Sequence, residues 1–176
     1  KGLLYADIRA TGSRTYAKLL GSYEMELLPA LERLTAVPYN NLINIGSDEG
    51  YYAVGLARLV PELNVIAFDC NKTAREKCTA LALLNGVQDR IKVKGCFSMN
   101  DLEAHDKQGR CLVIIDCEGC ENEIIDDRLV KEFAKADFII ELHYEQNPQV
   151  LSKMENLFAA THRISLIRAL CDHERV

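Results

Sequence analysis

Short apolar runs that alternate with longer helical patterns constrain the fold of this chain more than any other feature of its sequence. Such runs cover residues 42–46, 65–69, 91–95, 111–116 and 138–143, and we expect a sixth strand at residues 163–167. Strands that are apolar on both faces are typical of a parallel sheet covered by helices on both sides. Because crossovers between parallel strands are right-handed, the sequence predicts an α/β fold with a mostly parallel, doubly wound sheet.

Helical patterns fill the intervals between these runs. They cover residues 51–60, 72–85 and 148–160. Residues 14–36 also place leucines near helical spacing, which predicts one or two helices ahead of the first strand. We therefore expect an N-terminal helical segment at residues 1–40, which can act as a lid, and one ligand-binding domain over residues 41–176.

Length, composition and charge restrict the function as well as the fold. The 176 residues, of which 48% are hydrophobic, suffice for one domain with a sizeable core. The formal net charge of −5 argues against general nucleic-acid binding, because nucleic-acid-binding proteins usually carry a basic face. No apolar run approaches the length that spans a bilayer and no signal peptide is recognisable, so we expect no membrane association. The sequence leaves the oligomeric state open.

The cysteines of the chain are odd in number, and several lie inside apolar runs. Cys117 and Cys120 have a CxxC spacing, but no second CxxC pair accompanies them. We therefore expect free thiols that pack as small apolar side chains. Because disulfides are rare in the reducing cytosol, free thiols predict a cytoplasmic protein.

A glycine-containing loop follows the first predicted strand and leads directly into a helix. Its sequence is Asn44-Ile45-Gly46-Ser47-Asp48-Glu49-Gly50. Ligands of doubly wound sheets bind at the carboxyl ends of the strands, and the helix after such a loop often holds a phosphate. Asp48 and Glu49 would repel a phosphate and favour a cationic ligand, such as S-adenosylmethionine (SAM) with its sulfonium and ammonium groups. The alternative is a tight turn with capping carboxylates.

The second predicted strand ends in Asp69, which follows Gly50 by about the spacing seen in nucleotide-binding folds. A carboxylate at this position can accept hydrogen bonds from both hydroxyl groups of a ribose. The alternative is that Asp69 only caps the next helix.

Three carboxylates crowd the end of the fourth predicted strand, at Asp116, Glu118 and Glu121. Such crowding raises the pKa of the carboxyl groups unless a cation or hydrogen-bond donors intervene, and it is typical of functional sites. The fifth predicted strand leads to His143, which is either a general base or a surface or capping histidine.

Four motifs in collinear order resemble those of the FkbM-type family of SAM-dependent methyltransferases. They lie at residues 44–53, 67–69, 84–91 and 116–121, the last corresponding to an Asp-Val-Glu-Gly-Ala-Glu signature. The resemblance implies a Rossmann-like class I methyltransferase fold with SAM as cofactor. It also implies O-methylation of a small-molecule or sugar-like acceptor.

The same resemblance assigns residues to each part of SAM. It places Gly46, Ser47, Asp48, Glu49, Gly50 and Tyr51 at the methionine end, Asp69, Cys70 and Asn71 at the ribose, and Cys96, Phe97 and Ser98 near the adenine. Asp116 and Glu118 face the methyl group and the acceptor.

The chain departs from the family pattern in three places. Cysteines replace the small apolar residues of the fourth-strand signature, at Cys117 and Cys120. The reversed seventh strand of the fold has no counterpart, so we expect the domain to continue beyond Val176. Tyr23 and Glu24 either point inward from a lid over SAM or belong to an ordinary amphipathic helix.

Methyl transfer to a hydroxyl group requires alignment of the reacting atoms and a base. We expect Asp116, Glu118 or His143 to take the proton, without a metal. In a weaker alternative Asp116, Glu118 and Glu121 bind magnesium or calcium. Two further functions are open: a non-catalytic SAM-binding module on the same fold, and an NAD-dependent oxidoreductase, which the acidic loop disfavours.

Overall fold

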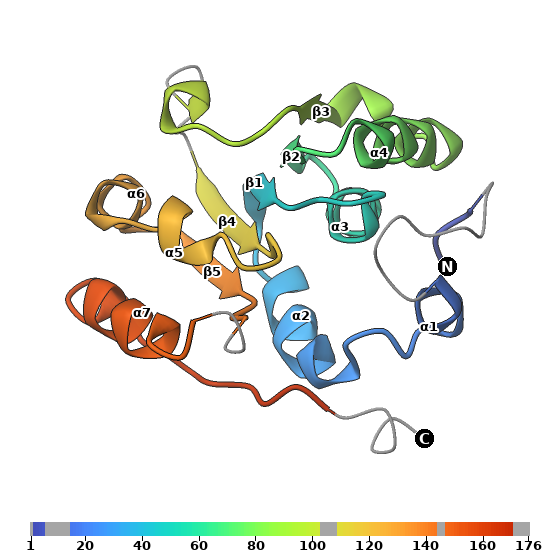
Figure 1. The fold of residues 1–176 in the computed structure, drawn as a ribbon. Helices are drawn as coiled ribbons and strands as arrows, with labels where there is room; N and C mark the ends of the chain where they lie inside the picture. Colours follow the sequence, from blue (N-terminus) through green and yellow to red (C-terminus); the bar gives the residue numbers. More distant parts are fainter. Residues whose placement is uncertain (1, 6–14, 103–108, 144–146, 171–176) are drawn as a thin grey trace.

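A five-stranded parallel sheet forms the centre of the protein (Figure 1). The computed structural model describes residues 2–5, 15–102, 109–143 and 147–170. The strands are β1 (Tyr39–Ile45), β2 (Asn64–Phe68), β3 (Ile91–Lys94), β4 (Arg110–Ile115) and β5 (Asp137–Ile140). Their order across the sheet is β3-β2-β1-β4-β5. The predicted α/β fold with a parallel, doubly wound sheet is confirmed.

Helices cover both faces of this sheet, as the apolar strands require. One face carries α3 (Tyr51–Leu59) and α4 (Lys72–Leu84), and the other carries α5 (Glu121–Ile124), α6 (Asp127–Glu132) and α7 (Val150–Phe158) (Figure 1). Alternate side chains of β1 belong to two separate hydrophobic cores. Leu42 lies in the core with α3 and α4, whereas Ile43 lies in the core with α6 and α7. Two short helical turns flank β3, namely η2 (Gln88–Arg90) before it and η3 (Met99–Leu102) after it.

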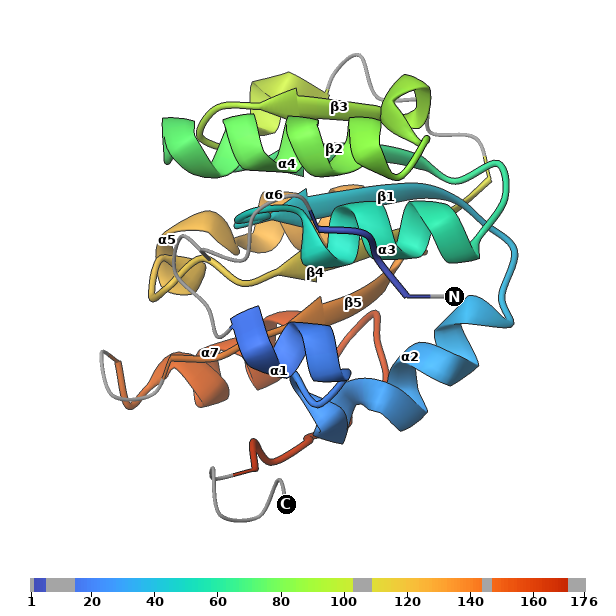
Figure 2. The same cartoon turned by 90° about the vertical axis from the view of Figure 1, so that its right-hand side faces the viewer.

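The N-terminal segment lies on the same side of the sheet as α3 (Figure 2). It comprises α1 (Thr15–Leu20), η1 (Met25–Leu27) and α2 (Leu28–Thr35), and Leu34 of α2 packs against the core under α3. The prediction of one or two helices before the first strand is confirmed. Within the described residues every helix is too short or too polar to span a lipid bilayer.

The connection order creates a switch point between β1 and β4. The chain runs from β1 outward to β2 and β3, then returns to the far side of β1 as β4. Ile45 at the end of β1 is paired with Phe68 of β2 and with Ile115 of β4. The residues that follow these strand ends therefore meet at one edge of the sheet, where ligands of doubly wound folds bind.

The sixth strand expected at residues 163–167 is wrong. These residues form no strand, and Ile164, Leu166 and Ile167 are exposed. Further along, the backbone N–H of Leu170 donates to Glu26 of η1. The segment has the alternating apolar residues of a strand, but it runs to the N-terminal segment and does not pair with β5.

The expectation of free thiols is also wrong for one pair of cysteines. Cys70 and Cys96 form a disulfide, with their Cα atoms 4.3 Å apart. Phe68 of β2 is paired with Lys94 of β3, so the residues two positions further on lie opposite one another. Cys78, Cys111, Cys117 and Cys120 are free thiols as expected, and Cys171 lies outside the described residues.

Candidate functional site

The loop between β1 and α3 has a backbone that requires glycine at both ends. Gly46 has a φ of 77°, and a Cβ there would lie 1.5 Å from the carbonyl oxygen of Asp116. Gly50 has a φ of 96°, and a Cβ there would lie 2.7 Å from the Sγ of Cys78. Both positions combine the left-handed conformation with close approach of neighbouring groups, so only glycine fits them. The loop is thus pressed against the end of β4.

Asp69 fixes the other side of this loop. Its Oδ2 accepts a hydrogen bond from the backbone N–H of Asp48 at 2.8 Å, and its Oδ1 accepts one from Asn71 at 2.8 Å. The alternative in which Asp69 only caps α4 is wrong, because the cap is Asn71, whose Oδ1 accepts from the backbone of Thr73. Carboxylate oxygens accept more than one hydrogen bond each, so Asp69 retains acceptor capacity for a ligand.

Polar atoms buried in and next to the loop have no partner among the described residues. They are the Oγ of Ser47, the side-chain amide of Asn44 and the Oε2 of Glu49. Glu49 is only 6% exposed, and its other oxygen, Oε1, accepts a hydrogen bond from the Nζ of Lys18. Burial raises the pKa of Glu49, and Asp48 raises it further, whereas Lys18 lowers it. Because unsatisfied buried acceptors are costly, this loop is suited to a ligand that brings hydrogen-bond donors.

The predicted ribose and adenine residues line the ends of β2 and β3. Cys70 and Asn71 are exposed next to Asp69, and the disulfide brings Cys96 beside Cys70. Ser98 is exposed after β3. Phe97 packs edge-on against Phe68, with ring centroids 5.2 Å apart.

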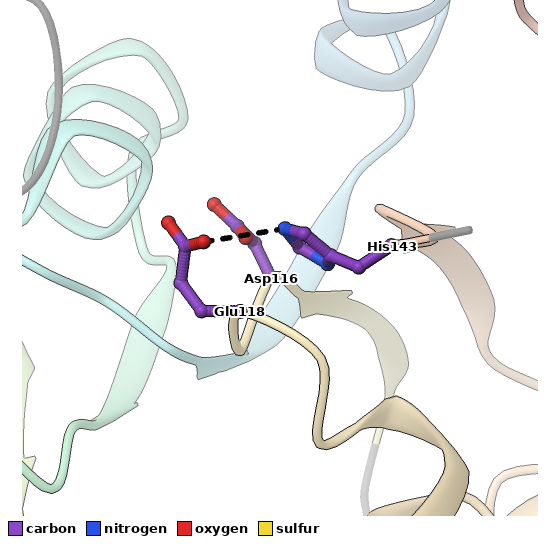
Figure 3. Close-up of side chains that lie close together, drawn as sticks. All are labelled: Asp116, Glu118 and His143. Atoms are coloured by element: carbon purple, nitrogen blue, oxygen red, sulfur yellow. Dashed lines mark ion pairs between the residues drawn. The ribbon is translucent and has the colours of Figure 1, made fainter. Parts of the chain in front are cut away.

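Asp116, Glu118 and His143 come together at the ends of β4 and β5 (Figure 3). One ligand-capable atom from each lies within 4.8 Å of the other two. The Nε2 of His143 lies 3.4 Å from the Oε2 of Glu118. Glu118 has a φ of 55°, a left-handed conformation that is uncommon for a residue other than glycine and often marks a functional site. A second such group joins Asp116 to Glu24 and Glu141.

Glu121 contacts the opposite nitrogen of the His143 ring from Glu118. Its side chain is 1% exposed, and its Oε1 lies 2.8 Å from the Nδ1 of His143 and accepts a hydrogen bond from the backbone of Gly119 at 3.1 Å. The alternative metal site of Asp116, Glu118 and Glu121 is therefore wrong in its third ligand. The interpretation of His143 as an ordinary surface histidine is also wrong, because a buried carboxylate orients its ring.

The pKa of Asp116 is raised as the sequence predicts, but burial is the largest cause, and Glu141 and Glu24 raise this pKa more than the predicted neighbour Glu118 does. Burial and, in decreasing order, the charges of Glu141, Glu24 and Glu118 together raise the pKa of Asp116 to about 8. The Oδ1 of Asp116 is buried and has no partner among the described residues. Burial and the charge of Glu24 also raise the pKa of Glu141. Near neutral pH, Asp116 is therefore largely protonated.

The N-terminal segment reaches this edge of the sheet. The ring of Tyr23 packs edge-on against Tyr51 of α3, with centroids 5.2 Å apart. Glu24 has a φ of 46° and accepts a hydrogen bond from the hydroxyl of Tyr52. Both residues lie between α1 and η1 and point toward the loop and the carboxylates, so the amphipathic-helix interpretation of them is wrong.

Sequence reasoning missed three residues of this site. Lys18 lies in a helical pattern that gives no sign of an inward-pointing lysine, and it meets Glu49 across 31 positions. Glu141 directly follows β5, and the rule that ligands bind at strand ends draws attention to it. Tyr52 adjoins the assigned loop, but its hydrogen bond to Glu24 spans 28 positions.

No family model matches the sequence, and no curated protein matches it either. Solved structures do share the fold. An O-methyltransferase from Bacillus cereus, solved in complex with SAH (S-adenosylhomocysteine), is 16% identical, and the alignment covers 80% of this chain and 70% of that one with a TM-score of 0.58. A ribosomal protein L11 methylase from Lactobacillus delbrueckii subsp. bulgaricus is 20% identical over 92% of this chain and 78% of that one, with a TM-score of 0.59.

A third structure, described as an O-methyltransferase from Klebsiella pneumoniae, is 18% identical with a TM-score of 0.53. The alignment covers 85% of this chain, which spans 62% of the length of that protein. The fold of this chain is thus the Rossmann-like fold of class I SAM-dependent methyltransferases. At these identities the likeness concerns the fold, and the FkbM-type relationship stays a prediction.

Proposed function

We propose that this chain is the SAM-binding domain of a methyltransferase. The observation that carries the proposal is the buried carboxylate of Glu49, whose Oε2 has no partner among the described residues, in a loop held between Asp69 and Asp116. SAM offers an ammonium group to an acidic acceptor and ribose hydroxyls to a carboxylate such as Asp69. The SAH complex of the Bacillus cereus structure supports the same cofactor class.

The proposed cofactor site follows the residues predicted from the sequence. Gly46, Ser47, Asp48, Glu49, Gly50 and Tyr51 surround the methionine end; Asp69, Cys70 and Asn71 the ribose; and Cys96, Phe97 and Ser98 the adenine. When bound, SAM supplies an electrophilic methyl group that needs no further activation. The protein then has to align the acceptor with the methyl group, which alone can lower the reaction barrier by several kcal/mol.

His143 is the base that the geometry favours. In the neutral tautomer that donates its Nδ1–H to the Oε1 of Glu121 at 2.8 Å, Nε2 is the unprotonated nitrogen and lies on the side of Glu118 and Asp116, where it can accept a proton and then pair with Glu118. A histidine oriented by a buried carboxylate is a common arrangement for proton abstraction. Asp116, which is largely protonated near neutral pH, then donates a hydrogen bond to the acceptor and does not take its proton.

The proposed acceptor is a hydroxyl group of a small or sugar-like molecule. The side chain of Glu118 is 80% exposed beside the imidazole of His143, so an acceptor reaches the base from solvent past this carboxylate. The FkbM-type motifs favour such acceptors. A cytoplasmic location stays a prediction, and the disulfide between Cys70 and Cys96 removes part of its basis.

Transfer of a labelled methyl group from SAM to a panel of hydroxyl-bearing acceptors tests the proposal. We expect a methylated product with the wild-type chain, and a loss of turnover at saturating SAM for His143→Gln that exceeds the loss for Glu118→Gln. Unchanged turnover in His143→Gln, Glu118→Gln and Asp116→Asn would refute the catalytic assignment. SAM binding without any methylated product would favour the non-catalytic module.

A further inference from the structure

Lys18 is a buried lysine of helix α1. The residue is 7% exposed, whereas its neighbours Leu19 and Leu20 face solvent. Its Nζ contacts the Oε1 of Glu49 and lies 3.9 Å from the Oδ2 of Asp48. A lysine is almost never buried unless its charge is paired, and this one is paired with the loop assigned to the methionine end of SAM.

Two aromatic rings complete the surroundings of this ammonium group. The Nζ of Lys18 lies 4.8 Å from the ring centroid of Tyr23 and 5.3 Å from that of Tyr51. Both distances are within the range of cation–π attraction. We call Asp48, Glu49, Tyr23 and Tyr51 the cation cage.

We propose that Lys18 is a cofactor-recognition residue that binds the α-carboxylate of SAM, while Glu49 binds the neighbouring ammonium group. The inference rests on the proposed function. The amino-acid end of SAM carries one cation and one anion on the same carbon atom. The buried ion pair places the positive charge of Lys18 next to the negative charge of Glu49, so the two side chains together match the carboxylate and the ammonium group of SAM.

The unpartnered oxygen of Glu49 supports this assignment. Glu49 is 6% exposed, and its Oε1 is engaged by Lys18 while its Oε2 has no partner among the described residues. The hydroxyl of Tyr5 is likewise buried without a partner, and burial and the charge of Glu49 raise its pKa. Such groups are stabilised when a ligand brings hydrogen-bonding atoms to them.

The charge of the cage favours a cofactor that binds beside Lys18 and does not replace it. One ammonium group against the carboxylates of Asp48 and Glu49 leaves a single net negative charge. SAM carries a single net positive charge, because its sulfonium and ammonium groups outnumber its carboxylate by one. Binding therefore neutralises the site, whereas expulsion of Lys18 would leave it with excess negative charge in a buried place.

The N-terminal segment is also anchored to the start of α3, directly after the loop. Tyr23 packs against Tyr51, and Glu24 accepts a hydrogen bond from Tyr52. These contacts hold the segment that carries Lys18 next to the loop.

The test compares SAM with decarboxylated SAM, which keeps the sulfonium and the amine but lacks the carboxylate. Calorimetric titration gives the ratio of the two dissociation constants for the wild type and for Lys18→Met. We expect the wild type to prefer SAM by at least about tenfold, because a charge-assisted contact is lost in the analogue. Lys18→Met should reduce this ratio to near one, mainly by weakening the binding of SAM.

Three further variants keep the test decisive. Lys18→Arg retains the charge and should retain part of the preference, whereas Lys135→Met, an exposed lysine remote from the cage, should leave the ratio unchanged. If Lys18→Met folds poorly because it leaves the charge of Glu49 buried and unpaired, the double variant Lys18→Met/Glu49→Gln avoids the problem by removing both charges. It should also lose the preference.

The outcomes separate the inference from the proposed function. A wild-type chain that binds no SAM overturns both. A wild type that binds SAM, with a ratio that Lys18→Met leaves unchanged, overturns the inference alone. Tighter SAM binding by Lys18→Met also overturns it, because Lys18 would then be a competitor of the cofactor.

Discussion

The Nδ1 of His143 lies 2.8 Å from the Oε1 of Glu121, a carboxylate whose side chain is 1% exposed. The two residues come from different strand ends and are 22 positions apart. The pairing places the Nε2 of the imidazole on the side of Glu118 and Asp116, which is the side of the proposed proton transfer.

Glu121→Gln should lower kcat by about tenfold to a hundredfold, because the amide orients the ring but lacks the charge that stabilises a protonated imidazole. The dissociation constant for SAM should stay unchanged, since Glu121 lies behind His143. Steady-state kinetics and calorimetry check the two expectations separately. Glu123→Gln, an exposed residue of the same helix, is the control and should leave both quantities unchanged. A loss of SAM affinity equal to the loss of kcat would contradict the positioning role.

Asp116→Asn should increase the free energy of unfolding at pH 8. The folded-state pKa of Asp116 is about 8, well above its value in the unfolded chain, so the folded protein holds a proton that the unfolded chain releases. The stability contributed by this proton is present at low pH and is lost as the pH rises from about 4 to about 8, with a slope of up to about 1.4 kcal/mol per pH unit.

Urea unfolding at several pH values measures this dependence for the wild type, for Asp116→Asn and for the exposed control Asp89→Asn. The advantage of Asp116→Asn should vanish near pH 4. A difference that is independent of pH would show that Asp116 has an ordinary pKa.

Gly46→Ala should prevent the loop from forming. The new Cβ would meet the carbonyl oxygen of Asp116 at 1.5 Å while φ remains in the left-handed region. We expect a destabilisation of at least about 3 kcal/mol, because the clash adds to the backbone strain. Gly86→Ala is a matched control, since Gly86 has a φ of 68° but nothing within 4 Å of its added Cβ, and it should cost only about 1–2 kcal/mol. Equal effects of the two substitutions would contradict the close approach of the loop to β4.

The sequence predicts those parts of the site that depend on chain order. The strand ends at Gly46, Asp69 and Asp116 are recognisable because each apolar run stops at a polar residue or a glycine, and parallel strands bring these ends to one edge. The order of the motifs then places the acidic loop, the carboxylate of Asp69 and the carboxylates after β4 correctly relative to one another.

Features that depend on register or on distant contacts were not predictable. The disulfide requires the pairing of Phe68 with Lys94, which no local pattern reveals. Lys18 meets Glu49 only because the N-terminal segment folds back over the loop. Residues 163–167 alternate apolar and polar side chains as a strand does, but this pattern does not show whether the residues pair with the edge of a sheet.

Calorimetric titration of SAM and of NAD into the wild type and into Asp69→Ala tests the central claim most directly. Asp69 accepts hydrogen bonds from Asp48 and Asn71 and faces the proposed ribose position, so its loss removes one part of the site. We predict that the wild type binds one SAM and no NAD, and that Asp69→Ala weakens SAM binding by about tenfold or more. Binding of NAD in preference to SAM, or SAM binding that Asp69→Ala leaves unchanged, would contradict the account.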